Sequence, residues 1–171
     1  MGQYADIINA WKGRLEPVPP GNISGEAPPA AWQLLTTAGL PTAEAYALDF
    51  VRDQRMAKPF DHLGRGYLFV AEDLSGFRYG LSLADGHIDR IFHGYPEPPN
   101  FVNSTLSHFL ILLGECSLDL WPYLSVWRPA TDQHAALERF EELVRRRDPA
   151  ALAPDAYWRF VIANFRQQVE P

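Results

Sequence analysis

Hydrophobic positions recur at helical spacing at both ends of the chain and alternate with polar positions in the middle. Near the N-terminus this spacing predicts a short amphipathic helix, with an apolar stripe formed by Tyr4, Ile7, Ile8, Trp11 and Leu15. The Pro- and Gly-rich segment 17–29 predicts a surface loop. A second helix is expected from Pro29, with Trp32, Leu34 and Leu35 inside and Gly39 ending it in the left-handed conformation.

The period changes to two after residue 45, which predicts strands at 46–50, 67–71, 77–83 and 87–92. Both faces of 67–71 are apolar, as in a strand covered on both sides. The 77–83 strand has one apolar face and one small or polar face, so it is expected to be half buried. Leu74-Ser75-Gly76 and Asp85-Gly86 each predict a hairpin, and the second favours a type I′ turn.

Helical spacing returns after the Pro-rich run 96–99, which cannot continue a hydrogen-bonded ladder. Asn103 or Ser104 is expected to cap a helix, Thr131 or Asp132 to begin another, and Asp155 to cap the last. Their predicted buried stripes are, in order, Leu106, Phe109, Leu110 and Leu113; Ala136, Phe140, Leu143 and Val144; and Trp158, Val161, Ile162 and Phe165.

This order of elements predicts an α+β fold with a mainly antiparallel sheet flanked by N-terminal and C-terminal helices. A chain of 171 residues fits a single domain. Its expected parts are the N-terminal helices and Pro-rich loop (1–39), the sheet and capped helix (40–115), and the C-terminal helices (116–171).

Composition places the chain among proteins of a reducing compartment. Cys116 is the single cysteine, so no internal disulfide can form and a buried structural thiol is expected. Neither an export signal nor an apolar run of membrane-spanning length is recognisable. These features predict a cytoplasmic protein without a membrane partner.

The net charge of −6 is concentrated in the middle of the chain. Between residues 60 and 120, three arginines oppose eight carboxylates, a net of −5, whereas both ends are near neutral. An acidic field repels nucleic-acid phosphate and steers basic partners toward it. A solvated surface that keeps the protein in solution is the alternative explanation.

No arrangement of residues predicts catalysis. His87, Asp89 and His93 would face one way as metal ligands only if the strand continued unbroken through Gly94, so structural or surface histidines are expected. Cys116 lies too far from His108 along a predicted helix to form a nucleophile and base pair.

Three further motifs also have ordinary structural explanations. Gly64-Arg65-Gly66 precedes a strand and lacks the Lys-Ser/Thr of a phosphate-binding loop, which favours a turn. The acids at 138, 141 and 142 predict a solvated helix face with the arginines at 139 and 145–147. That arginine run is too balanced by acids to predict nucleic-acid binding.

Several short motifs occur in a particular order and spacing over residues 40–165. They are Leu40-Pro41, the strand 67–72, the Asp-Gly turn, Val102-Asn103-Ser104 followed by Phe109 and Leu110, and Trp158 in the last helix. In this order and spacing they resemble the SUKH superfamily, especially its fourth immunity-protein subgroup. The resemblance implies a compact α+β domain that neutralises a bacterial polymorphic toxin, often a nuclease or nucleic-acid deaminase. It implies no enzymatic activity, cofactor or metal.

The charge pattern and the resemblance together predict a toxin with a basic active-site face as the partner, and no direct nucleic-acid binding. The expected partner-binding residues are turn and strand-end acids together with neighbouring aromatic anchors: Glu72, Asp73, Phe77, Asp85, Asp89, Phe92, Tyr95 and Glu97. A regulatory interaction scaffold of the same fold is one alternative. A small hydrolase or metal-binding enzyme using the histidines, Asp89 and Cys116 is another.

Overall fold

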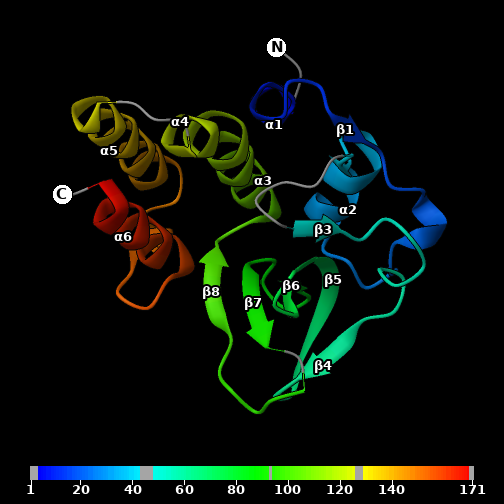
Figure 1. Ribbon diagram of the computed structural model, residues 1–171. Coiled ribbons are helices and arrows are strands. Elements are labelled where there is room, and N and C mark those ends of the chain that lie inside the picture. Colours follow the sequence, from blue (N-terminus) through cyan, green and yellow to red (C-terminus); the bar gives the residue numbers. More distant parts are fainter. Residues whose placement is uncertain (1–3, 43–47, 93, 126–128, 170–171) are drawn as a thin grey trace.

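The central element is a six-stranded antiparallel sheet (Figure 1). The computed structural model describes residues 4–42, 48–92, 94–125 and 129–169. The sheet order is β3-β5-β6-β7-β8, and β4 pairs with the start of β5 while β3 pairs with its end. Its strands are β3 (Leu48–Phe50), β4 (Phe60–His62), β5 (Arg65–Asp73), β6 (Phe77–Ser82), β7 (Ile88–Phe92) and β8 (Asn100–Asn103), and a separate small sheet joins β1 (Leu15–Glu16) to β2 (Leu40–Pro41).

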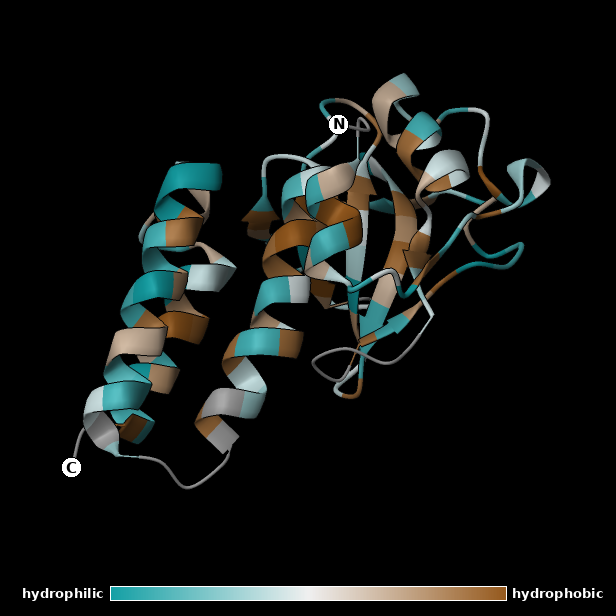
Figure 2. Cartoon of the chain, turned by 90° about the horizontal axis from the view of Figure 1, so that it is seen from above, coloured by the Kyte–Doolittle hydropathy of each residue, from teal (hydrophilic) through white to brown (hydrophobic). Residues whose placement is uncertain are grey.

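Helices precede and follow the sheet in sequence, which confirms the predicted α+β class. The N-terminal helices are α1 (Ala5–Ala10) and α2 (Pro29–Thr37), with a short 3-10 turn, η1 (Pro20–Asn22), between them. After β8 come α3 (Leu106–Glu115), a π-helical turn η2 (Cys116–Leu120), α4 (Trp121–Ser125), α5 (Ala130–Arg147), the 3-10 turn η3 (Pro149–Leu152) and α6 (Tyr157–Val169). Viewed from above, α5 and α6 form a pair that stands beside α3 and α4 (Figure 2).

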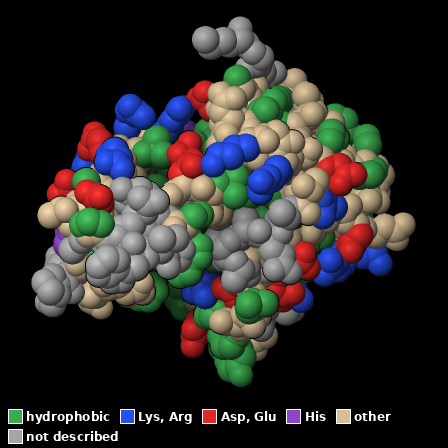
Figure 3. All heavy atoms as spheres, turned by 45° about the horizontal axis from the view of Figure 1, so that its top comes forward, with side chains coloured by type: hydrophobic (Ala, Val, Ile, Leu, Met, Phe, Trp, Pro, Cys, Tyr) green, Lys and Arg blue, Asp and Glu red, His purple; other side chains and the backbone are tan. Residues whose placement is uncertain are grey.

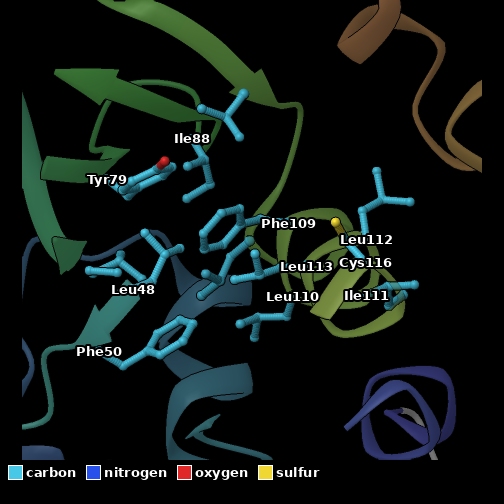
Figure 4. Packing of buried hydrophobic residues seen from close by; sticks show 14 of the residues in the cluster. Leu48, Phe50, Tyr79, Ile88, Phe109, Leu110, Ile111, Leu112, Leu113 and Cys116 are labelled. Atoms are coloured by element: carbon cyan, nitrogen blue, oxygen red, sulfur yellow. The ribbon is translucent and has the colours of Figure 1, made fainter. Parts of the chain in front are cut away.

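The main core lies between one face of the sheet and α3. Tyr79 of β6 stacks on Phe109 of α3 with ring centroids 5.7 Å apart, and Tyr157 of α6 meets Tyr79 edge-on at 5.9 Å. Figure 4 shows Leu48 and Phe50 from β3 pointing toward the same helix. The predicted stripe of α3 is confirmed, because its four leucine and phenylalanine positions are all at most 2% exposed.

The second face of the sheet is also covered, so the prediction of a half-buried strand at 77–83 is wrong. Gly80 and Ser82 of β6 are buried on this face. A Cβ at Gly80 would lie 2.9 Å from the Tyr67 ring, so only glycine fits this position without displacement of its neighbours. The segment 94–99 reaches the same face, where His62 Nε2 donates to the Glu97 carbonyl at 2.8 Å.

Two short strands of the central sheet were missed by pattern reasoning, as were both strands of the separate small sheet. β4 has only three residues, and β8 follows directly after the prolines at 98 and 99. The prolines do take the chain off the sheet, but it returns at once to pair with β7. Three or four residues are too few for a recognisable alternation.

The expected cap of α3 is also wrong, for a reason that explains the Asn-Ser motif. Thr105 caps the helix, accepting a hydrogen bond from the His108 amide at 3.1 Å. Asn103 and Ser104 instead bind Asp148, the residue that follows α5, through contacts of 2.9 Å from Asn103 Nδ2 and 2.6 Å from Ser104 Oγ. Trp158 Nε1 donates to Asn103 Oδ1 at 2.9 Å, so this buried network joins β8, the end of α5 and α6.

Of the predictions for α2 and for the second hairpin, some are confirmed and others are wrong. Pro29 does begin α2, and Gly39 follows the helix with φ of 85°. Trp32, expected inside, is 40% exposed. The hairpin at Asp85-Gly86 exists, but Asp85 has no positive φ and the loop is longer than a type I′ turn, with β6 ending at Ser82.

At the N-terminus, Leu15 lies in β1 and not in the first helix, and Ile8 of the predicted stripe is 45% exposed. The predicted starts of the last two long helices are also wrong, because α5 begins at Ala130 after Pro129 and α6 begins at Tyr157, two residues after Asp155.

The buried stripes of the C-terminal helices agree better with the prediction. The stripes of α5 and α6 are confirmed except at Leu143, which is half-buried. Leu48 and Phe50 are buried as expected of a strand at 46–50, while Tyr46 and Ala47 lie outside the described residues.

Candidate protein-binding surface

Two of the predicted partner-binding acids, Asp73 and Glu72, form ion pairs with neighbouring arginines. Asp73 ends β5 and lies 2.9 Å from the Arg90 guanidinium, and its other oxygen accepts from the Ser75 and Phe77 amides. Glu72 lies 3.8 Å from Arg78 across the β5–β6 pair. The side chain of Asp73 is only 14% exposed, so this carboxylate fastens the turn between β5 and β6.

Asp85 and Asp89 belong to a hydrogen-bonded chain on the second face of the sheet. Asp89 is 3% exposed and lies 2.8 Å from both Tyr67 Oη and His87 Nε2. Asp85, which is exposed, lies 2.6 Å from His87 Nδ1. The hydrogen bond to Asp89 and the two negative charges raise the pKa of His87. A partner would therefore meet Asp85 directly, but not Asp89.

The predicted aromatic anchors form one continuous stack. Tyr95 lies parallel to Phe92 with centroids 4.4 Å apart, and Phe92 stacks on Phe77 at 4.8 Å. Arg90 extends the stack, since its guanidinium carbon lies 3.5 Å from the centre of the Phe77 ring. Phe77 and Phe92 are half-buried while Tyr95 is 54% exposed, so the stack runs from the sheet into solvent.

Tyr95 and Glu97 lie in the segment that is hydrogen-bonded to the β4–β5 hairpin, and both are exposed. Figure 1 shows this segment beside the hairpin at the lower end of the sheet. The hairpin contributes two exposed residues that the sequence reasoning did not select, Asp61 and Leu63. We call these four residues, Asp61, Leu63, Tyr95 and Glu97, the loop surface. Hydrophobic and acidic side chains are visible together at this lower end in Figure 3.

Leu63 is unfavourable for the fold in two respects. It is 56% exposed, and its φ of 53° lies in the left-handed region, which is unfavourable for residues other than Gly, Asn and Asp because Cβ approaches the following carbonyl oxygen. Gly64 follows with φ of 77°, so the hairpin has the two successive positive φ values of a type I′ turn. A sequence signal existed in the Leu-Gly pair before a strong strand, but leucine is rare at the first position of such turns.

Among the described residues, no group of three or more His, Cys, Asp or Glu side chains could hold a metal ion. Both His87 nitrogens face carboxylates, which leaves neither free to take a proton from a substrate. His93 lies outside the described residues. Cys116 is fully buried as expected, and burial raises the pKa of its thiol to about 12, so it is a poor nucleophile at neutral pH.

The surface chemistry suits protein recognition. An exposed aromatic side chain with polar residues around it is typical of an interface centre with a polar rim. None of the helices in the described ranges is long and apolar enough to cross a membrane.

Comparison with known proteins supplies the family. No curated protein and no solved structure shows significant similarity to the chain. The family described as SUKH-4 immunity protein matches residues 12–164, which include every strand of the central sheet and most of α6. The chain therefore belongs to the SUKH-4 immunity protein family.

Proposed function

We propose that this immunity protein neutralises a nuclease or nucleic-acid deaminase toxin by covering its basic active-site face with the loop surface. Two observations carry the proposal: the exposed, left-handed Leu63 at the tip of the β4–β5 hairpin, and the stacked Tyr95 in the segment that the His62–Glu97 hydrogen bond joins to this hairpin. The exposed Asp61 and Glu97 lie on the same two segments. Neither carboxylate has a cationic partner in the described part of the chain. A residue that lowers stability and gains nothing from burial in the free protein is best explained by a contact in the complex.

The anchors are held in place before binding. Tyr95 is restrained by its parallel stack on Phe92, and the segment around it is fastened by the His62 hydrogen bond to Glu97. Side chains that are already ordered lose less conformational entropy on association. A tyrosine that is ordered in this way has the properties of an interface hot spot.

Charge supports a basic partner. The net of −5 between residues 60 and 120 includes the arginines that pair with Glu72 and Asp73, so the excess negative charge remains after local pairing. Such a field accelerates encounter with a basic cleft and disfavours direct binding to nucleic acid. Enzymes that act on nucleic acids carry basic clefts, which is why this toxin class fits.

Co-expression with the cognate toxin tests this proposal. The variant Leu63→Ala/Tyr95→Ala is expected to lose protection, because it removes both anchors while leaving the buried core intact. Its matched control is Ile8→Ala/Trp32→Ala, which removes two apolar side chains that are 45% and 40% exposed on α1 and α2. Full protection by the anchor variant at equal protein level would contradict the assignment.

A further inference from the structure

A second site lies between the helices, away from the loop surface. A cleft of about 590 Å³ separates α5 from the end of α3 and the π-helical turn η2. Figure 2 shows the α5–α6 pair standing apart from α3 and α4 on this side. Known small-molecule sites occupy roughly 300–1,000 Å³, so the volume suffices for an organic ligand.

The floor of the cleft is apolar. Leu120 of η2 and Ala136 and Phe140 of α5 are 4%, 8% and 5% exposed, and the half-buried Leu143 continues the same side of α5. Phe140 is fixed from behind by an edge-on contact with Trp158, with ring centroids 5.4 Å apart. The floor is therefore a rigid hydrocarbon surface that favours an apolar body over water.

The rim on α5 is basic. Arg139 and Arg146 both line the cleft and lie about two helical turns, or roughly 10 Å, apart. Within the described ranges, neither guanidinium has an ion-pair or hydrogen-bond partner. Arg147 pairs with Asp6 at 2.8 Å, yet its buried Nε has no hydrogen-bond partner among the described residues. An unused buried donor is costly unless something accepts from it.

The acids across the cleft do not cancel this charge. Asp119 is paired with Lys12 at 2.9 Å, and burial together with Asp119 raises the pKa of Glu115. Counting both sides with their partners, four cations (Lys12, Arg139, Arg146 and Arg147) face three carboxylates (Asp6, Glu115 and Asp119). The cleft is thus locally positive in a protein whose net charge is −6.

We propose that this cleft binds an amphipathic organic anion, with an apolar body on the Phe140 floor and a carboxylate, sulfonate or phosphate group at Arg139 and Arg146. An inorganic ion would leave the apolar floor unused, and a neutral apolar molecule would leave the guanidinium groups unused. Both features together specify the ligand class. The site shares no residue with the loop surface, so it can fail or succeed independently of toxin binding.

The test uses 8-anilinonaphthalene-1-sulfonate, an aromatic sulfonate whose fluorescence reports binding to the full chain. One saturable site is expected. Its dissociation constant should rise at least about tenfold in Arg139→Gln/Arg146→Gln, the loss expected when charge-assisted contacts are removed. The control Lys58→Gln/Arg159→Gln removes two exposed positive charges elsewhere and should bind like the wild type.

Two further measurements separate the proposal from general hydrophobic adsorption. The uncharged analogue N-phenyl-1-naphthylamine should bind more weakly than the sulfonate, and equally to wild type and Arg139→Gln/Arg146→Gln. Amide NMR shifts on addition of the sulfonate should be largest in α5 and η2. Equal sulfonate affinity in both double variants, tight binding of the uncharged analogue, or shifts centred elsewhere would overturn the proposal. Matching circular dichroism melting curves confirm that the variants fold.

Discussion

Asp148 is the residue on which the junction between sheet and C-terminal helices depends most. It is 2% exposed and accepts hydrogen bonds from Asn103 Nδ2, Ser104 Oγ and the Ser104 amide. Burial alone would raise the pKa of this carboxyl, but His108 nearby and the hydrogen bonds from Ser104 and Asn103 outweigh it and lower the pKa to about 2. The ionised form is therefore the one that the fold stabilises.

A depressed folded-state pKa contributes stability that is complete above the unfolded-state pKa and disappears below the folded one. For Asp148 the window runs from about pH 4 down to about pH 2, and the contribution is about 2 kcal/mol. Urea unfolding at pH 6 and pH 2.5 should show this loss in the wild type. Asp148→Asn should be less stable at pH 6 and lose less on acidification, whereas the exposed control Asp155→Asn should behave like the wild type.

Leu63 leads to a prediction in which stability and binding change in opposite directions. Asparagine tolerates the left-handed backbone better than leucine, so Leu63→Asn should raise the free energy of unfolding by up to about 1 kcal/mol. The same change should weaken toxin binding. Leu74→Asn is the control, since Leu74 is 91% exposed without a positive φ and its replacement should leave stability nearly unchanged. A less stable Leu63→Asn protein would contradict the strain argument.

For single residues, sequence reasoning identified important positions more reliably than it identified what those residues do. Asn103, Trp158 and Asp89 were all selected, yet the first two form an internal network with Asp148, and the third is buried beside Tyr67. Side-chain polarity indicates that a group needs a partner, but the partner comes from strand register and helix placement. Those long-range contacts are absent from local spacing.

Helix α1 illustrates how close approach between elements depends on single small residues. Trp11 Nε1, just after α1, donates to the Leu110 carbonyl in α3 at 2.8 Å. One turn further along α3, a Cβ at Gly114 would lie 2.9 Å from the Ala10 carbonyl oxygen. The backbone of α1 therefore packs against α3 at a position where only glycine leaves enough space.

Because of this contact, replacing Gly114 by alanine is expected to lower the stability of the protein, although the same replacement raises stability in most helices. Gly to Ala within a helix ordinarily gains about 1 kcal/mol from helix propensity. Gly114→Ala should instead destabilise by about 1–3 kcal/mol, the usual cost of overpacking, because a backbone oxygen cannot rotate away. Thermal and urea unfolding measure it, with Ser107→Ala on the same helix as the control. An increase in stability would show that α1 can shift without cost.

Element prediction succeeded where periodicity was long and failed where it was short. The stripes of α3 and α6 and the doubly covered β5 were predicted correctly, because each presents several turns or residues of consistent pattern. β4 and β8 were missed, and with them the cover over the second face of the sheet. A turn was predicted at Gly64, but without β4 it could not be recognised as a hairpin tip that exposes Leu63.

Across the whole molecule, two surface regions differ in charge. The loop surface presents two acids that have no cationic partner among the described residues, together with two exposed apolar anchors, whereas the helical cleft is locally basic. The family match from residue 12 to 164 supports an immunity role for the chain as a whole. It leaves the face that meets the toxin to be identified by measurement.

The dissociation constant of the complex with the toxin's catalytic domain tests the central claim most directly. Asp61→Lys/Glu97→Lys should weaken binding by at least about tenfold at low salt, with a smaller effect at high salt, because screening reduces the lost attraction. The control Glu26→Lys/Glu138→Lys makes the same change in net charge at exposed sites elsewhere and should weaken binding far less. Equal affinities for the two charge-reversed proteins would contradict binding through the loop surface.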